Sequence, residues 1–135
     1  MTEEIQKIIN FSLEYAKDLM EDTGELYPFG MYVSNDGNIH PLEFEFDKKN
    51  IPTNGQIIER FEKFFSEEIE TNTIRAYCIA FDVHIQLEEN SPGSDAVCFD
   101  ITSNSDLNVP LFYIPYKIDT SGKPFFQEMF AVKRK

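Results

Sequence analysis

The segment 53–71 carries the feature that constrains this fold most, a capping box followed by a continuous apolar stripe. Thr53 and Gln56 stand three residues apart, the spacing at which these two side chains close the first helical turn on each other. Charged residues fill one side of the segment, and apolar residues recur at the helical period on the other. The apolar positions are Ile57, Ile58, Phe61, Phe64, Phe65 and Ile69. The pattern predicts a helix over 53–71 that packs on a core.

A second amphipathic pattern, over 2–20, predicts another helix. Thr2 is a suitable N-cap, Glu3 and Glu4 suit the positive end of the helix dipole, and Gly24 suits the end of the helix. Its apolar positions are Ile5, Ile8, Ile9, Leu13, Ala16, Leu19 and Met20.

The remaining segments have strand patterns separated by turn residues. The predicted strands cover 29–34, 39–47, 74–87, 96–102, 109–118 and 125–132. Because these strands follow one another through short turns, they favour an antiparallel sheet. In 40–47 apolar and acidic residues alternate, which indicates a sheet with one wet side. We predict a single α+β domain over 1–135, in the order α-β-β-α-β-β-β-β, with a single mostly antiparallel sheet and two helices packed on one face.

The charge of the chain restricts its partners. The 135 residues carry a net charge of −12, and nearly all the acidic excess lies before residue 71. Such a field repels phosphate groups, so we expect no nucleic-acid partner and no anionic membrane partner. A basic protein suits this charge, and an acidic surface also serves solubility.

Localisation follows from what the sequence lacks. It has no apolar run long enough to cross a membrane, and its first residues lack the basic start and apolar stretch of a signal peptide. Cys78 and Cys98 do not make a disulfide framework in a chain of this length, so we expect two reduced thiols and a cytoplasmic location.

The hairpin between 74 and 102 contains the first candidate site residues. Centring its turn on Pro92 matches apolar residues on one face of both strands, as expected where one face is buried. The matched pairs are Leu87 with Val97, Ile85 with Phe99, and Val83 with Ile101. The polar face then pairs His84 with Asp100, Asp82 with Thr102, and Gln86 with Cys98.

Asp82, His84 and Asp100 on one polar face allow two interpretations. A carboxylate beside an imidazole can orient it for base catalysis, and the three residues together can hold a metal. The outer face of a half-buried sheet is also expected to be polar, with opposite charges paired across strands. We favour the second interpretation because the chain has no metal or nucleotide motif of fixed spacing, and we expect no metal and no cofactor.

A second candidate is Glu25, in the corner between the first helix and the first strand. Leu26, Tyr27 and Phe29 flank it, so partial burial could raise its pKa and make it a binding-site acid. Alternatively, its carboxylate accepts backbone hydrogen bonds and fixes the corner. We favour the structural role.

Several short segments together resemble a family of small uncharacterised acidic bacterial α+β proteins. They are Glu25-Leu26-Tyr27-Pro28-Phe29-Gly30 before Asp36-Gly37, Ala80-Phe81-Asp82-Val83, Ala96-Val97-Cys98-Phe99-Asp100, and Pro115-Tyr116. In that family an E-F-Y-P-F-like entry to a hairpin precedes a helix and several strands that end in P-Y. No activity is implied. In size, charge and architecture the chain is also similar to immunity proteins encoded beside bacterial toxins, which is an analogy.

These observations lead to one expected function and two alternatives. We expect a non-enzymatic protein-binding domain, of immunity or antitoxin type, that blocks a basic partner through acidic residues of the first half. These are Glu43, Glu45 and Asp47, with Glu59, Glu62, Glu67 and Glu68. The first alternative is a small-ligand binder or hydrolase-type enzyme that uses Glu25, Asp82, His84, Asp100 and Tyr116. The second is a homodimer joined through Phe112, Phe125, Phe126 and Phe130.

Overall fold

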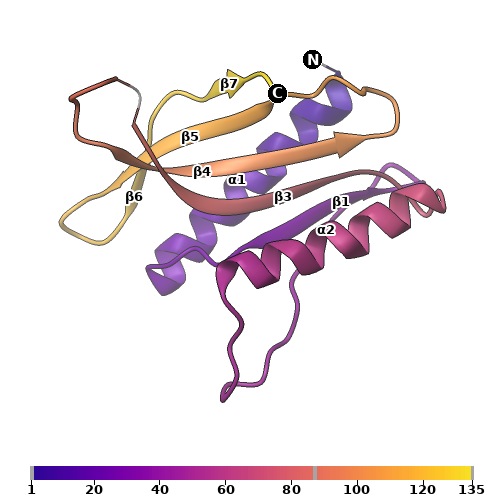
Figure 1. Cartoon of the computed structure of the whole chain (residues 1–135), viewed down its shortest axis with the longest axis horizontal. Coiled ribbons are helices and arrows are strands. Elements are labelled where there is room, and N and C mark those ends of the chain that lie inside the picture. Colours follow the sequence, from indigo (N-terminus) through magenta and orange to yellow (C-terminus); the bar gives the residue numbers. More distant parts are fainter. Residues whose placement is uncertain (1, 87, 135) are drawn as a thin grey trace.

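The computed structural model describes residues 2–86 and 88–134. It contains two helices and one seven-stranded sheet in which every paired strand is antiparallel (Figure 1). The elements are α1 (Glu3–Thr23), β1 (Phe29–Ser34), β2 (Ile39–Leu42), α2 (Asn54–Glu70), β3 (Ile74–Ile85), β4 (Ser94–Ser103), β5 (Leu111–Ile118), β6 (Pro124–Phe126) and β7 (Phe130–Val132). The predicted α+β class, antiparallel sheet and element order are confirmed.

The strand order is β2-β1-β3-β4-β5-β6, and β7 also pairs with β5. β6 pairs with one end of β5 and β7 with the other. Between them the Gln127 amide donates to the Pro115 carbonyl at 2.8 Å. The predicted strand over 125–132 is therefore divided into two short strands that pair with different parts of β5.

The predicted strand over 39–47 is shorter in the structure and ends at Leu42. After it, Phe44 and Phe46 pack against α2. The rings of Phe44 and Phe61 lie 4.4 Å apart between centroids, and the Arg60 guanidinium lies 4.3 Å from the Phe44 centroid. Contact with α2 thus replaces sheet pairing in this segment.

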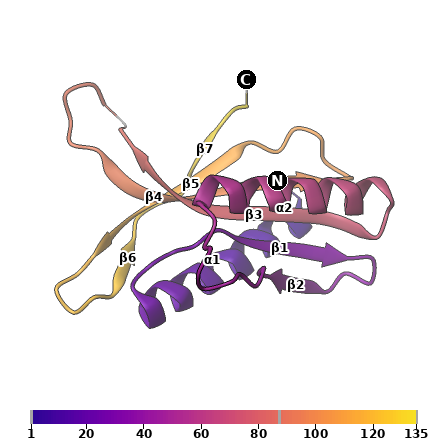
Figure 2. The same cartoon turned by 60° about the horizontal axis from the view of Figure 1, so that its bottom comes forward.

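The two helices cover opposite faces of the sheet, so the prediction that both pack on one face is wrong. α1 packs in a cluster with Met31 and Cys78, whereas Phe65 of α2 packs on Tyr77, with ring centroids 4.8 Å apart. Tyr77 and Cys78 are neighbours on β3, and neighbours in a strand point to opposite faces. Figure 2 shows α1 and α2 on the two sides of the sheet. The central strands are apolar on both faces, as a sheet between two layers requires.

Gly30 allows α2 to approach β1 closely. A Cβ added at Gly30 would lie 2.6 Å from Phe65 Cε2 and 2.9 Å from Phe61 Cε1. Both phenylalanines are fully buried. The aromatic layer under α2 therefore occupies the space that a side chain at Gly30 would need.

Both helices begin at the predicted caps. The Ile5 amide donates to Thr2 Oγ1 at 3.2 Å, and Thr53 and Gln56 form the capping box. Gly24 ends α1 in the left-handed conformation, with φ of 75°. Neither described helix is long and apolar enough to span a bilayer.

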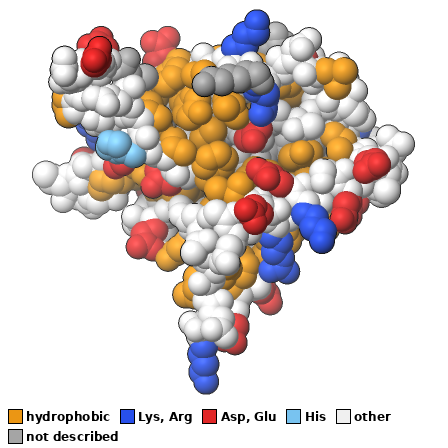
Figure 3. Space-filling view, in the orientation of Figure 1, with side chains coloured by type: hydrophobic (Ala, Val, Ile, Leu, Met, Phe, Trp, Pro, Cys, Tyr) orange, Lys and Arg blue, Asp and Glu red, His pale blue; other side chains and the backbone are white. Residues whose placement is uncertain are grey.

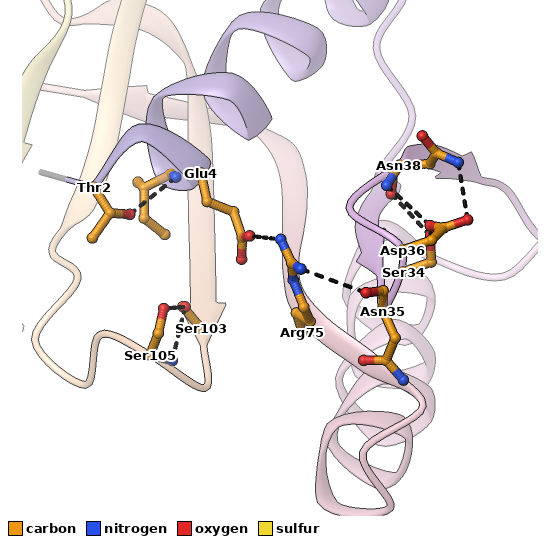
Figure 4. Close-up of polar contacts among 10 residues, drawn as sticks. Thr2, Glu4, Ser34, Asn35, Asp36, Asn38, Arg75, Ser103 and Ser105 are labelled. Atoms are coloured by element: carbon orange, nitrogen blue, oxygen red, sulfur yellow. Dashed lines mark hydrogen bonds and ion pairs between the residues drawn. The ribbon is translucent and has the colours of Figure 1, made fainter.

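A polar cluster ties α1 to the sheet (Figure 4). Arg75 on β3 forms an ion pair with Glu4 of α1 and also donates to the Asn35 carbonyl at 3.5 Å. Asn35 lies in the turn between β1 and β2, where Asp36 accepts from the Asn38 amide at 3.1 Å. Arg75 thereby links three elements that are distant in sequence.

Candidate functional site

The most distinctive surface lies beside α2, where the sheet is only partly covered. α2 packs on β3 and β1. Among the residues that the structure describes, no helix lies over the same side of β4, β5 and β7, and Figure 3 shows a broad apolar area there. We call this surface the open face. The strand registers assign to it Phe81, Val83, Ala96, Cys98, Leu111, Tyr113, Pro115, Phe130 and Val132.

The open face is apolar across four adjacent strands. Phe81 is opposite Cys98, Cys98 is opposite Tyr113, and Tyr113 is opposite Phe130. The rings of Tyr113 and Phe130 stack with centroids 5.6 Å apart, and both are half-buried. Val132 keeps 41% of its surface exposed. A contiguous apolar surface of this kind is typical of an interaction site.

Charged residues border the open face along α2. A groove of about 550 Å³ lies there, lined by Glu59, Glu62, Lys63, Ser66, Tyr77, Ile79, Asp100, Thr102 and Arg134. Asp100 forms an ion pair with Arg134, whose Nε also donates to the Val109 carbonyl at 2.8 Å. With Asp100 and Arg134 paired to each other, the groove wall that α2 supplies has two carboxylates and one ammonium.

The predicted binding acids do not share one surface. Glu62 lines the groove beside the open face, whereas Glu43 lines a separate apolar cavity of about 310 Å³ with Phe44 and Phe46. Burial, together with the Glu43 carboxylate, raises the pKa of Tyr15 to about 12. Glu45 is exposed. Of these three acids, only Glu62 lies beside the open face.

A polar cavity on the α1 side of the sheet brings together three other predicted residues. Glu25, Asp82 and Tyr116 line a space of about 410 Å³, together with Asp95. The Tyr116 hydroxyl donates to Asp82 Oδ1 at 2.8 Å. Partial burial raises the pKa of Asp82, and the hydrogen bond from Tyr116 opposes this shift. Burial and the adjacent Asp82 carboxylate raise the pKa of Tyr116. The pair can hold or share a proton.

The predicted His84–Asp100 pair is wrong. His84 is opposite Asp95, with Nδ1 and Oδ1 at 3.2 Å, whereas Asp100 is opposite Ile79 and faces the α2 side. The Asp82–His84–Asp100 metal group is therefore also excluded, and no other metal-holding group of three or more His, Cys, Asp or Glu residues occurs in the described chain.

The register differs because the turn is centred nearer Asn90, which has a φ of 71°. In this register Val83 is opposite Ala96 and Ile101 is opposite Cys78, and Asp82 is opposite Val97. The predicted Ile85–Phe99, Asp82–Thr102 and Gln86–Cys98 pairs are likewise not formed; Ser94, Tyr77 and Phe81 take the partner positions of Ile85, Thr102 and Cys98. The predicted partner of Val97, Leu87, lies outside the described residues. Apolar matching did not select the register, because β4 has small or apolar residues on both faces.

The two cysteines are free and buried. Cys78 faces α1, whereas Cys98 lies in the floor of the open face. Burial raises the pKa of Cys98 to about 12 and raises the pKa of Cys78 further. Both thiols therefore stay protonated near neutral pH, and a protonated thiol is a poor nucleophile.

Sequence reasoning missed Tyr113 as a surface residue. It placed Phe130 in a homodimer interface with Phe112, Phe125 and Phe126, but Phe112 is 3% exposed and packs in the α1 cluster, so the four do not form one surface. Leu111–Pro115 and Phe130–Val132 are apolar at every position, a pattern typical of strands whose two faces are both apolar. Such a pattern does not say which of the two faces a helix covers.

Comparison with known proteins gives no relative: no protein-family model matches the chain, and neither a curated protein nor a solved structure is similar to it. Its function is therefore inferred from the geometry of the surfaces described above.

Proposed function

We propose that this chain is a non-enzymatic protein-binding domain, and that its open face receives a partner with an apolar and basic surface. The observation that supports the proposal is the half-covered α2 side of the sheet, where Tyr113 and Phe130 stack beside Phe81 at the edge of the α2 cluster, and neither described helix lies over β4, β5 and β7. Aromatic residues are enriched where proteins bind one another. In a blocking role of immunity or antitoxin type, this face would cover the working surface of a basic protein.

The exposed surface of the chain is large for its mass. It amounts to 8683 Å², whereas a folded monomer of 15.7 kDa is expected to expose about 7,300 Å². The excess of about 1,400 Å² exceeds the roughly 800 Å² that each partner loses in a complex of standard size. Loops project from the sheet (Figure 1) and add to the exposed surface of the chain.

Charge favours a basic partner over a second copy of this chain. The net charge of −12 attracts a basic protein over long range and accelerates its association. Two copies joined through their open faces would bring Glu59 and Glu62 of one near those of the other. We therefore propose a heterologous partner as the occupant.

Capture from the cells that make this protein tests the proposal. Val132→Lys places a charge on the open face, and Ile118→Lys is its matched control, because Ile118 is 47% exposed but lies on the other side of the sheet. We expect a basic protein to be captured at low salt by the wild type and by Ile118→Lys, but not by Val132→Lys. Equal capture by all three proteins, or no basic protein at either low or high salt, contradicts the proposal.

A second candidate is a small-ligand binder that uses the cavity on the α1 side. The hydrogen-bonded Asp82–Tyr116 pair beside Glu25 supports it. The experiment is an NMR screen of small polar amines against the wild type and Asp82→Asn. This candidate predicts shifts around Asp82 and Tyr116 that Asp82→Asn abolishes. Shifts that persist in the variant, or their absence for every compound, contradict it.

A further inference from the structure

We infer that the element of the partner that occupies the open face is an amphipathic helix, lying beside α2 with its lysine or arginine side chains toward Glu59 and Glu62. This inference depends on the proposed protein-binding function and names the structure and chemistry of the occupant. It would complete the second helical layer, of which α2 forms only one part.

The spacing of the strands fits one helix next to α2. Adjacent strands lie about 4.8 Å apart, so two strand steps cover about 10 Å. Packed helices have interaxial distances of about 8–10 Å. Since α2 lies over β1 and β3, a helix beside it would lie over β4 and β5, over which neither of the described helices lies on this side of the sheet.

The sizes of the side chains also suit a helix. β4 contributes only the small residues Ala96 and Cys98 to the middle of the open face, whereas β3 contributes Phe81 and β5 contributes Tyr113. Ala96 and Cys98 are 0% and 1% exposed, so the larger side chains of the neighbouring strands form the accessible surface. The half-buried rings of Phe81 and Tyr113 are the side chains that the apolar stripe of a bound helix would contact.

Addition of a partner strand is the competing mode, and the edges of the sheet do not favour it. On one edge, β6 covers only Pro124–Phe126 and β7 only Phe130–Val132; on the other, β2 covers Ile39–Leu42 with Pro41 inside it. A proline lacks the amide that an added strand would need, and a short edge offers few backbone bonds. The open face offers a larger contact than either edge.

Charge sets the orientation of the helix. Glu59 and Glu62 line the groove on the α2 side together with Lys63, while Asp100 is already paired with Arg134. The remaining charge on the α2 wall is negative, so the flank of the bound helix that faces α2 should be basic. These contacts are partly exposed, and their contribution should decrease with added salt.

Two synthetic peptides of leucine and lysine test the inference. Both match the 17 residues of α2 in length and share one composition. In one, leucine follows the helical period; in the other, leucine and lysine alternate as in a strand. Fluorescence anisotropy measures their binding to the wild type, to Tyr113→Lys, to Glu59→Gln/Glu62→Gln and to Ile118→Lys. Val132→Lys, at a more exposed position, replaces Tyr113→Lys if that variant fails to fold.

We expect the helical peptide to bind at least tenfold more tightly than the alternating peptide. Tyr113→Lys should weaken its binding about tenfold, the double glutamine variant severalfold at low salt only, and Ile118→Lys less than twofold. Tighter binding of the alternating peptide, still lost in Tyr113→Lys, overturns the helix while the protein-binding function stands. The helix is also overturned if neither peptide binds, or if both bind the wild type and Tyr113→Lys equally well. If, in addition, Val132→Lys captures the basic protein as well as the wild type does, the protein-binding function of the open face is overturned too.

Discussion

Gly30→Ala tests the placement of α2 with a single methyl group. The new Cβ would lie 2.6 Å and 2.7 Å from Phe65 Cε2 and Cζ, and 2.9 Å from Phe61 Cε1. Both rings are 0% exposed, so neither can move into solvent. Either the rings leave their rotamers or α2 moves away from β1.

The magnitude follows from two opposing effects. Overpacking of a well-packed core costs about 1–3 kcal/mol. Replacing glycine with alanine restricts the unfolded chain, which returns about 0.4–1 kcal/mol where the backbone accepts alanine. Gly30 does not have a positive φ, so its backbone accepts alanine. The difference between the midpoints of these two ranges is a fall of about 1.3 kcal/mol in the free energy of unfolding.

Urea denaturation measures this change, with Gly55→Ala as the control. Gly55 lies in the exposed first turn of α2, and a Cβ there would come no closer than 3.9 Å to Thr53 Oγ1. Alanine at this position should leave the free energy of unfolding unchanged or raise it by up to about 1 kcal/mol. If Gly30→Ala behaves like Gly55→Ala, α2 does not lie on Gly30, and the assignment of the two helices to opposite faces is refuted.

Three further predictions follow from individual contacts. The pKa of Tyr15 is about 12 in the folded protein, against an ordinary value of 10.0. As the pH rises, the unfolded chain therefore loses this proton before the folded protein does. The free energy of unfolding should fall from pH 10 upward, and it should fall less steeply in Tyr15→Phe. Denaturation titrations at alkaline pH measure this, and equal slopes would contradict it. Cys78 and Cys98 are buried with raised pKa values, so Ellman's reagent at mild pH should label neither thiol in the native protein and both in urea; rapid native labelling would count against the burial. Glu4→Gln removes the partly exposed ion pair with Arg75 and should lower the unfolding free energy by less than about 1 kcal/mol, with a smaller loss at high salt; a salt-independent loss above 2 kcal/mol would contradict this assignment.

The sequence alone specifies the elements well. The capping box at Thr53 and Gln56 and the apolar stripe after it predict α2, because both are local patterns that a helix requires. The strands are equally visible, apart from 43–47, where Phe44 packs on Phe61 across the sequence. A tertiary contact decides that segment, and periodicity does not record it.

The faces of the sheet are harder to predict. Tyr77 is half-buried against α2 and Cys78 is buried against α1. Because both faces of the strand are covered, a period-two pattern does not show which helix covers which face. Gly30 was the available signal, since a glycine inside a strand often marks close approach of another element. A register is normally specified by the need to bury the apolar face of each strand. Because both faces are apolar here, that requirement does not distinguish one β3–β4 register from another.

The β3–β4 register determines which of the predicted site residues lie on the same face of the sheet. Glu25, Asp82 and Tyr116 line one cavity. Asp100 does not join them, because an odd shift of register moves every residue of a strand to the other face. The open face was not foreseen, since it exists only because α1 and α2 occupy different sides.

Hydrogen exchange on the complex with the captured basic protein tests the proposed binding surface most directly. Amide protection should increase in β4, β5 and β7 and along α2 near Glu59 and Glu62, while the solvent side of α1 and the β2 edge stay unchanged. Protection concentrated on α1, on the Asp82–Tyr116 cavity or along β2 would show that the partner binds elsewhere, and the open face would then have no role in recognition.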